Sequence, residues 1–466
     1  MNPKRILLFI ASVMALVAIL GMTFPADGFE VGKKHIGFSS LQKIVNERNK
    51  YVDISENTET PDMSFLHDSV SYYQKLVHND MLRFWLPSAD YFDSFWKKVE
   101  SARGNNQTVR ILHYGDSQIE LDHISSNLRA YMQDKFGGGG PGMVPFHTIV
   151  PTPTVFQFNA GELIHLASFG DSTVVHSRGD YGVMMQCFRL AGGSASTSVR
   201  SSNSDKVDSH AKVFRKATLI FNNRGTSLSA TLNDRKHRTS DTQNTNQNGV
   251  SSFSWEFDTI NSLRVSVSGS ADLYCLLLDG GPGVAVDNIP MRGCSGQQFT
   301  GVNAAKLTAA YSQMNVGMII MQFGGNSVPY FKTTKSISDY CTSIGRQIEH
   351  VKRCCPQAKI LFIGPSDMST RIRGELQSYP ILPELIDSLS ATAVRHGAAY
   401  WSIYHAMGGH NSMPEWTRQG LAGHDYIHFS DRGAKEIGER LSRAFDNSYN
   451  LYKLNRRLRA EKGTKK

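Results

Sequence analysis

The sequence predicts an α/β fold: a three-layer α/β/α domain with a parallel sheet, interrupted by an inserted β-sandwich or jelly-roll module. Apolar runs of strand length alternate with helical patterns at 106–150 and again at 278–446. Strands that alternate with helices form βαβ units and parallel sheets with right-handed crossovers. Between these segments, residues 151–277 are rich in Ser, Thr and Asn and carry short alternating stretches, which indicates an inserted β-rich module.

Length and composition are those of a globular protein. At about 150 residues per domain, 466 residues predict two or three domains. Apolar residues make up 40% of the chain, an ordinary share once the 40 glycines are added. The chain can therefore bury a sizeable core, which argues against wholesale disorder, a collagen-like fold and a multi-span membrane protein.

The net charge of +9 is concentrated at the two ends of the chain. Residues 453–466 hold seven Lys or Arg and one Glu, and Lys4 and Arg5 lie at the start, which leaves +1 for the rest. A nucleic-acid-binding domain spreads basic residues over a folded face, so no nucleic-acid partner is expected. The basic C-terminal tail, 447–466, is predicted to be a solvated helix end or to touch an anionic lipid or polymer.

The N-terminus predicts export. A short positive start, Met1–Arg5, precedes nineteen uncharged residues, 6–24. This pattern is typical of a signal peptide or an N-terminal membrane anchor, which we assign to 1–28. The body is then expected outside the cytoplasm, in the periplasm, and its contact with the inner membrane is through the N-terminal segment only.

Helices and strands are expected in a regular order. Residues 29–105 form a mainly helical segment, with a helix at 88–103 that Ser88 caps. In the interrupted domain, the expected strands are 108–114, 284–290, 315–323, 358–364 and 398–404, and the expected helices are 118–136, 336–353, 381–396 and 431–446. In the module, the expected strands are 218–221, 228–232, 251–257, 262–268 and 273–278, and 233–250 is a polar loop.

Signals for metal binding are weak. The six cysteines are scattered without a C-x-x-C pair, and most of them are expected to behave as small buried apolar residues, although an exported chain permits disulfides. His424 and His428 are four residues apart, with His405 and His410 nearby, but no H-E-x-x-H and no helix support a zinc site there. No metal is therefore expected, and the serine mechanism described below needs no organic cofactor.

The strongest chemical signal is Gly115-Asp116-Ser117, at a change from strand to helix. Ligands of parallel sheets bind beyond the carboxyl ends of the strands. A serine there lies at a helix N-terminus, where free backbone N–H groups can bind an anion. The position therefore suits a nucleophile whose reaction builds an oxyanion, although Asp or Ser could also simply cap the helix.

A serine nucleophile needs a base, and Asp425 and His428 offer one. An Asp three residues before a His can reach the imidazole and hold the tautomer that accepts the serine proton. The alternative is a turn capped by Asp425 and a histidine on the surface.

Two glycine-containing segments could supply oxyanion donors. Gly324-Gly325-Asn326 follows the strand at 315–323, and an asparagine there can donate to a developing oxyanion. Arg292-Gly293-Cys294-Ser295-Gly296 follows 284–290, so a backbone N–H can reach the same place. An ordinary Asn-containing turn would explain the first segment equally well.

These four blocks, in this order, resemble those of the SGNH hydrolase (GDSL esterase) superfamily. The resemblance covers about 106–150 and 278–446. It implies that Ser117 is the nucleophile and first oxyanion donor, that Gly296 and Asn326 are the further donors, and that Asp425 and His428 complete the triad. Two positions depart from the pattern: Gln118 replaces the usual Leu, and Ser327 stands where many members have Asp.

The insertion indicates which branch of the superfamily the chain resembles. Ser117 and Gly296 are 179 residues apart, and an exported chain with such an insertion resembles the cell-envelope branch, which includes bacterial peptidoglycan O-acetylesterases. This implies a carbohydrate-binding role for 151–277, which we expect to be self-contained, with its two ends close together. It also implies that 406–423 is a loop over the site, where Trp416 and Met413 meet a sugar, unless both are core residues.

The resulting hypothesis is an exported serine esterase that removes O-acetyl groups from peptidoglycan or another cell-envelope polysaccharide. Its partner is thus an acetylated envelope glycan. One alternative is an O-acetyltransferase with the same triad, working with a membrane-bound acyltransferase partner. Another is a catalytically silent glycan-binding protein.

Overall fold

The computed structural model describes residues 29–31, 34–36, 68–69, 71–73, 75, 82–170, 179–234 and 239–464. The chain divides into two units, Met1–Tyr72 and Tyr73–Lys466. In the first unit, β1 (Phe29–Val31) and β2 (Lys34–Ile36) pair antiparallel. The segment expected to be a signal peptide or anchor, 1–28, lies outside the described residues. None of the helices that the structure describes is long and apolar enough to cross a membrane.

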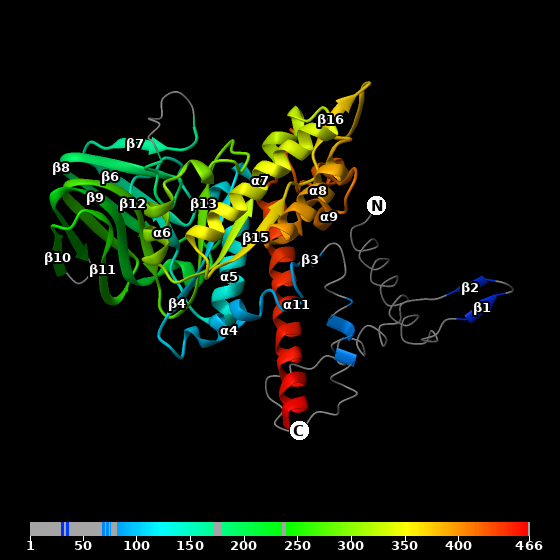
Figure 1. The fold of residues 1–466 in the computed structure, drawn as a ribbon, viewed down its shortest axis with the longest axis horizontal. Coiled ribbons are helices and arrows are strands. Elements are labelled where there is room, and N and C mark those ends of the chain that lie inside the picture. The colour runs from blue at the N-terminus through cyan, green and yellow to red at the C-terminus, as the bar shows by residue number, and fades with distance from the viewer. Residues whose placement is uncertain are drawn as a thin grey trace, which may run out of the picture. The chain divides into compact units, whose positions relative to one another are not determined.

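A six-stranded sheet forms the centre of the second unit (Figure 1). Its strands, in spatial order, are β13 (Gly283–Pro290), β4 (Thr108–Gly115), β14 (Val316–Gln322), β15 (Lys359–Gly364), β18 (Ala399–Ser402) and β3 (Phe84–Trp85). The first five run parallel, and β3 pairs antiparallel with β18. Nearly all of their residues are buried, as expected for a sheet covered on both faces. The predicted α/β fold is confirmed.

Helices cover the two faces of this sheet, so three layers result. On one face, a single core joins α4 (Asp93–Ala102), α5 (His123–Phe136), α9 (Ile403–Met407), α10 (Ser412–Arg418) and α11 (Asp431–Thr464). On the other face, a second core joins α6 (Ala304–Ser312), α7 (Thr334–Cys354) and α8 (Leu382–Arg395). Side chains of β4 alternate between the two cores, with Ile111 in the first and Leu112 in the second. All six cysteines are buried, as was expected for most of them, and all six are free.

Two helices differ from their predicted lengths. α4 begins at Asp93, not near Ser88, because the Ser88 hydroxyl bonds Asp90 in a preceding turn. α11 continues to Thr464, so the expected tail at 447–466 is helical over most of its length. The reason is a stripe of aromatic residues that continues the apolar face of the helix: Tyr449 packs on the Trp96 ring with ring centroids 5.1 Å apart.

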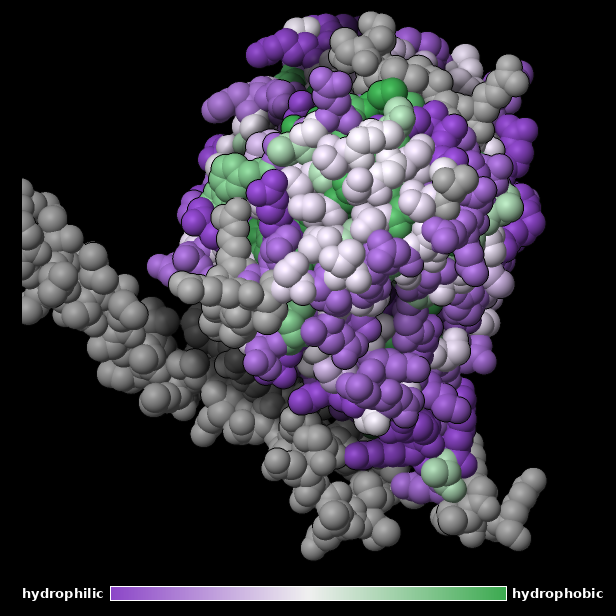
Figure 2. Space-filling model, turned by 90° about the vertical axis from the view of Figure 1, so that its left-hand side faces the viewer, coloured by the Kyte–Doolittle hydropathy of each residue, from purple (hydrophilic) through white to green (hydrophobic). Residues whose placement is uncertain are grey.

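The second sheet of this unit is antiparallel and has eight strands (Figure 1). They are β5 (Gly142–Pro145), β6 (Val155–Ala160), β7 (Ile164–Ala167), β8 (Gln186–Ser201), β9 (Phe214–Asp234), β10 (Thr239–Thr245), β11 (Gly249–Ile260) and β12 (Ser262–Asp279). The pairs of predicted strands at 218–221 and 228–232, and at 262–268 and 273–278, each merge into one long strand. The predicted loop at 233–250 contains β10, since its polar residues pair with the end of β9. Figure 2 shows this end of the molecule, where pale, weakly polar residues cover much of the surface.

The antiparallel sheet and the parallel sheet are joined through buried contacts. Residues 275–278 of β12 pair with β5, which lies before the expected start of the module. Arg110 of β4 bonds Asp279 and Asp287, each at 2.8 Å, and all three side chains are buried. One core contains both module residues such as Tyr274 and parallel-sheet residues such as Tyr114. The expectation that residues 151–277 are self-contained is therefore wrong, because they share a core with the parallel sheet.

Candidate active site

Ser117 lies where β4 ends, at the carboxyl edge of the parallel sheet. It begins a short 3-10 segment, η1 (Ser117–Asp122), in which the Asp116 carboxylate accepts the Gln118 backbone N–H at 3.0 Å. The helix predicted at 118–136 is interrupted here, because Leu121 and Asp122 have left-handed backbone angles, φ 57° and 61°. α5 begins only at His123.

The structure brings Ser117, His428 and Asp425 into one hydrogen-bonded chain. The Ser117 Oγ lies 2.9 Å from His428 Nε2, and His428 Nδ1 lies 2.7 Å from Asp425 Oδ2. Since a carboxylate only accepts, Nδ1 carries the proton and Nε2 is free to accept from the serine hydroxyl. The arrangement can activate the serine as a nucleophile.

Asp425 is held in place by its own turn. Its other carboxylate oxygen accepts the backbone N–H groups of Ile427 at 3.0 Å and His428 at 3.1 Å. Partial burial acts to raise the pKa of Asp425, but the hydrogen bonds from His428 and Ile427 outweigh it and lower the pKa below its usual value. The carboxylate is therefore charged at neutral pH, as an imidazolium partner requires.

Gln118 ties the serine segment to the histidine segment. Its Nε2 donates to the Ile427 carbonyl at 2.7 Å, and its Oε1 accepts the Phe429 N–H at 3.3 Å. The two contacts flank His428 on either side in the chain. The departure from the usual Leu at this position thus has a structural role, which no pattern within the sequence indicated.

Asn326 lies in η4 (Gly325–Tyr330), which begins three residues after the last residue of β14. Its side-chain amide donates to the Cys294 carbonyl at 3.0 Å and to Asp116 Oδ2 at 3.3 Å. Asp116 is 5% exposed, and burial raises its pKa to about 6, although the Gln118 N–H and His428 oppose the shift. The Asn326 amide already has two acceptors. To donate to an oxyanion, it would have to give up the longer contact, the one to Asp116.

Gly296 lies two residues after Cys294, in a loop held by buried partners. Tyr340 donates its hydroxyl to the Ser295 carbonyl at 2.6 Å. Gly296 has φ 85°, and a Cβ there would lie 2.8 Å from the Phe323 side chain, so only glycine fits. Among the residues described, no acceptor takes the backbone N–H of Gly296 or of Ser117.

A small cavity of about 190 Å³, here called the serine cavity, opens beside these groups. It is lined by Asp116, Ser117, Gln118, Gln322, Phe323, Gly325, Asn326, Pro329, Tyr330, Gly364, Pro365, Ser366, Met368, Ile403, Ile427 and His428. Three residues of the predicted set, Ser117, Asn326 and His428, thus face it together. Asp425 contacts His428, and Gly296 packs against Phe323, so each adjoins a residue that lines the cavity.

The segment 406–423 is not a loop over this cavity. It contains the end of α9 and all of α10, and Met413 and Trp416 are buried in the core between the helices and the sheet. The interpretation of both as core residues is confirmed. Within the described ranges, no three His, Cys, Asp or Glu side chains gather where they could hold a metal ion.

Comparison with known proteins places the fold. No family model matches the chain, and no curated protein matches it. A solved structure entitled "Peptidoglycan O-acetylesterase in action" is 22% identical and covers 76% of this chain and 95% of its own, with a TM-score of 0.61. The chain therefore has the fold of that esterase.

Two further matches are more distant. A family two carbohydrate esterase from Cellvibrio japonicus is 11% identical and covers 64% of this chain and 99% of its own, with a TM-score of 0.26. A family 2 carbohydrate esterase from Corynascus thermopiles (Myceliophthora fergusii) is 10% identical and covers 62% and 99%, with a TM-score of 0.27. These TM-scores are too low to indicate a common fold over the aligned lengths.

Proposed function

We propose that the chain is an exported serine esterase that removes O-acetyl groups from peptidoglycan or another cell-envelope polysaccharide. The observation that carries the proposal is the hydrogen-bonded chain Ser117–His428–Asp425 at the edge of a small cavity. The fold shared with a peptidoglycan O-acetylesterase supports the substrate class. The uncharged stretch 6–24 supports export.

The reaction proceeds in two halves. Ser117 Oγ attacks the ester carbonyl while its proton passes to His428 Nε2, and Asp425 stabilises the resulting imidazolium. The tetrahedral oxyanion takes hydrogen bonds from the Ser117 and Gly296 backbone N–H groups and from the Asn326 amide. The intermediate collapses when the sugar oxygen leaves with the proton of His428. Water, deprotonated by His428, then attacks the acyl-serine and releases acetate.

Replacement of Ser117 by alanine tests this proposal. We expect Ser117→Ala to lower turnover of p-nitrophenyl acetate by about 10⁴-fold or more, since loss of a triad serine removes the covalent route. Ser312→Ala, on an exposed position of α6, is the matched control and should keep full activity. Near-normal turnover by a folded Ser117→Ala protein would exclude the serine mechanism.

The natural reaction is tested with acetylated peptidoglycan and a second acetylated polysaccharide. Both free acetate and acetyl groups moved to a new sugar are measured, because transfer would use the same three residues with a sugar hydroxyl in place of water. Release of acetate as the main product is the expected result. Transfer as the main product would replace the esterase by an acetyltransferase.

A further inference from the structure

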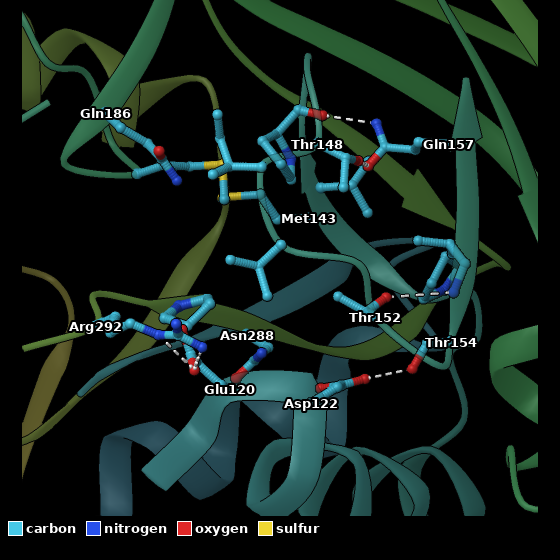
Figure 3. A pocket seen from close by; sticks show the side chains of 18 of the residues that line it. Glu120, Asp122, Met143, Thr148, Thr152, Thr154, Gln157, Gln186, Asn288 and Arg292 are labelled. Atoms are coloured by element: carbon cyan, nitrogen blue, oxygen red, sulfur yellow. Dashed lines mark hydrogen bonds and ion pairs between the residues drawn. The ribbon is translucent and has the colours of Figure 1, made fainter. Parts of the chain in front are cut away.

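A second cavity, larger than the serine cavity, lies at the seam between the parallel sheet and the antiparallel sheet (Figure 3). Its volume of about 500 Å³ is within the range of sites that bind small organic ligands. We call it the seam cavity. Glu120, Asn288 and Arg292 form its wall on the side of the parallel sheet, and Thr148, Gln157 and Gln186 lie on the opposite side, as Figure 3 shows.

Residues of η1 line both the seam cavity and the serine cavity. Ser117 and Gln118 line the serine cavity, and Glu120 and Asp122, from the same short segment, line the seam cavity. Leu121 and Asp122, the last two residues of η1 before α5, both have a left-handed backbone. Two successive non-glycine residues in this conformation store strain, which proteins retain mainly where a site requires it. The strained backbone therefore points to a function for the side chains that it directs into the cavity.

Arg292 uses only part of its guanidinium at the mouth of this cavity. Its Nε and Nη2 bond the Glu120 carboxylate at 2.6 to 3.0 Å. The side chain is 70% exposed, and among the described residues no acceptor is bonded to its Nη1. Glu120 thus orients Arg292 and leaves one edge of the guanidinium available.

Buried Arg110 shows what the available edge can hold. Its Nε and Nη2 bond Asp287, as those of Arg292 bond Glu120. Its Nη1 bonds both carboxylate oxygens of Asp279 at 2.8 Å. An arginine of this chain therefore holds two carboxylates at once, one on each edge. Arg292 has the first carboxylate in place and an open position for a second.

The remaining lining suits a sugar ring. Side chains of Met143, Val144, Val150 and Val155 give apolar surface, on which the C–H face of a pyranose can pack. Gln157 and other amide and hydroxyl groups provide hydrogen-bond partners for sugar hydroxyls. The buried charge of Asp122 does not repel a ligand, because Arg129 and Thr154 bond it at 2.5 and 2.7 Å.

We propose that the seam cavity binds a carboxylate-bearing part of the same glycan whose ester enters the serine cavity, with Arg292 as the contact to the carboxylate. The inference rests on the proposed function for its substrate class and adds to it a requirement for a negative charge on the same glycan. In peptidoglycan, that charge is the lactyl carboxylate of muramic acid or a carboxylate of the peptide attached to it.

Equilibrium binding tests the inference without any need for catalysis. The full chain carrying Ser117→Ala is titrated by calorimetry with three probes: N-acetylglucosaminyl-N-acetylmuramic acid, the same disaccharide carrying its peptide stem, and uncharged chitobiose. At least one charged probe should bind tighter than chitobiose. The stronger of the two charged probes identifies which carboxylate Arg292 contacts.

Variants of Arg292 then separate a ligand contact from a structural role. Arg292→Ala, introduced into the Ser117→Ala chain, should weaken binding of the charged probe about tenfold to a hundredfold, as expected for a lost hydrogen bond to a charged group. The affinity for chitobiose should not change. Arg292→Lys should restore part of the affinity because it keeps the charge. The control Arg215→Ala, at an exposed position outside the seam cavity, should change neither.

The possible results distinguish the two proposals. Equal affinity for charged and uncharged probes, binding unaffected by Arg292→Ala, or no binding of any probe would overturn the inference. If binding depends on Arg292 but the native chain cleaves no ester, the inference stands and the proposed function fails. If the native chain cleaves acetyl esters and Arg292→Ala does not change the affinity for the charged probe, the proposed function stands and the inference fails.

Discussion

Asp116 lies beside the serine and close to the position of the oxyanion. Its carboxylate holds the Asn326 amide, and burial raises its pKa to about 6. A carboxylate whose pKa is raised in the folded state destabilises that state when it ionises. The contribution of Asp116 to the free energy of unfolding is therefore fully present below the unfolded pKa of 3.8. It is lost as the pH rises through the folded pKa of about 6.

We expect Asp116→Asn to remove this pH dependence. As the pH rises from 4 to 7, the stability of the native chain should fall relative to that of the variant by on the order of 3 kcal/mol, since one pKa unit corresponds to 1.36 kcal/mol. Urea unfolding at several pH values measures the difference, and any constant cost of the substitution cancels from the slope. A parallel pH dependence in both proteins would contradict the raised pKa. Asp258→Asn, on the module surface, is the control.

At this scale, the sequence was enough to nominate Ser117, Asp425, His428 and Asn326, because short motifs carry them and the motifs of Ser117 and Asn326 lie just beyond strand ends. The contact from Asn326 to Asp116 could not be predicted, since the two residues are 210 positions apart. The same holds for Arg292 and Glu120, which lie in different blocks and meet only when β13 and β4 pair.

Between elements, Gln118 is the link that aligns η1 with the segment around His428. We expect Gln118→Leu to lower kcat on p-nitrophenyl acetate by at least tenfold, because leucine can make neither contact and a shift of about 1 Å in the base can cost a hundredfold. KM should change little. Gln118→Glu keeps the acceptor for Phe429 but loses the donor to Ile427. Its kcat should lie between that of Gln118→Leu and that of the native chain.

Full activity of Gln118→Leu would show that the histidine segment is held by its other contacts alone. These include the Gly423 N–H, which donates to the His428 carbonyl at 2.8 Å, and the Ser369 N–H, which donates to the Tyr426 carbonyl at 3.1 Å. Thermal unfolding of the variant separates a local change in alignment from a general loss of stability.

The pattern of apolar residues predicted most strands and helices of the parallel domain, because buried strands and amphipathic helices have distinct periods. It missed the break at Leu121, where no glycine or proline marks the left-handed turn. It also missed β10, whose seven residues are all polar and form a strand only because β9 offers an edge to pair with. In both places tertiary contacts outweigh the local signal.

For the whole molecule, the shared core predicts the result of removing the module. Deletion of 151–277 with a short Gly/Ser bridge should give a protein that does not fold, because it removes Tyr274 and Cys275 from the core that contains Tyr114 and Ile289. It also removes most of β12, which positions Asp279 against Arg110. Circular dichroism and size-exclusion chromatography measure the outcome. A folded, active shortened protein would show that the parallel sheet does not depend on this core.

The pairing of β4 also has a consequence for the order of folding. Thr108 pairs with Gly283, 175 positions later, whereas β9 pairs with β10, β11 and β12 that follow it closely. Contacts between distant positions form slowly, because a long loop must close before they contribute. During synthesis from the N-terminus, the strand that leads to Ser117 is thus made early but acquires its neighbours late. We expect the nucleophile to be assembled only after the hairpins of the module have formed, so the growing chain has no esterase activity until then.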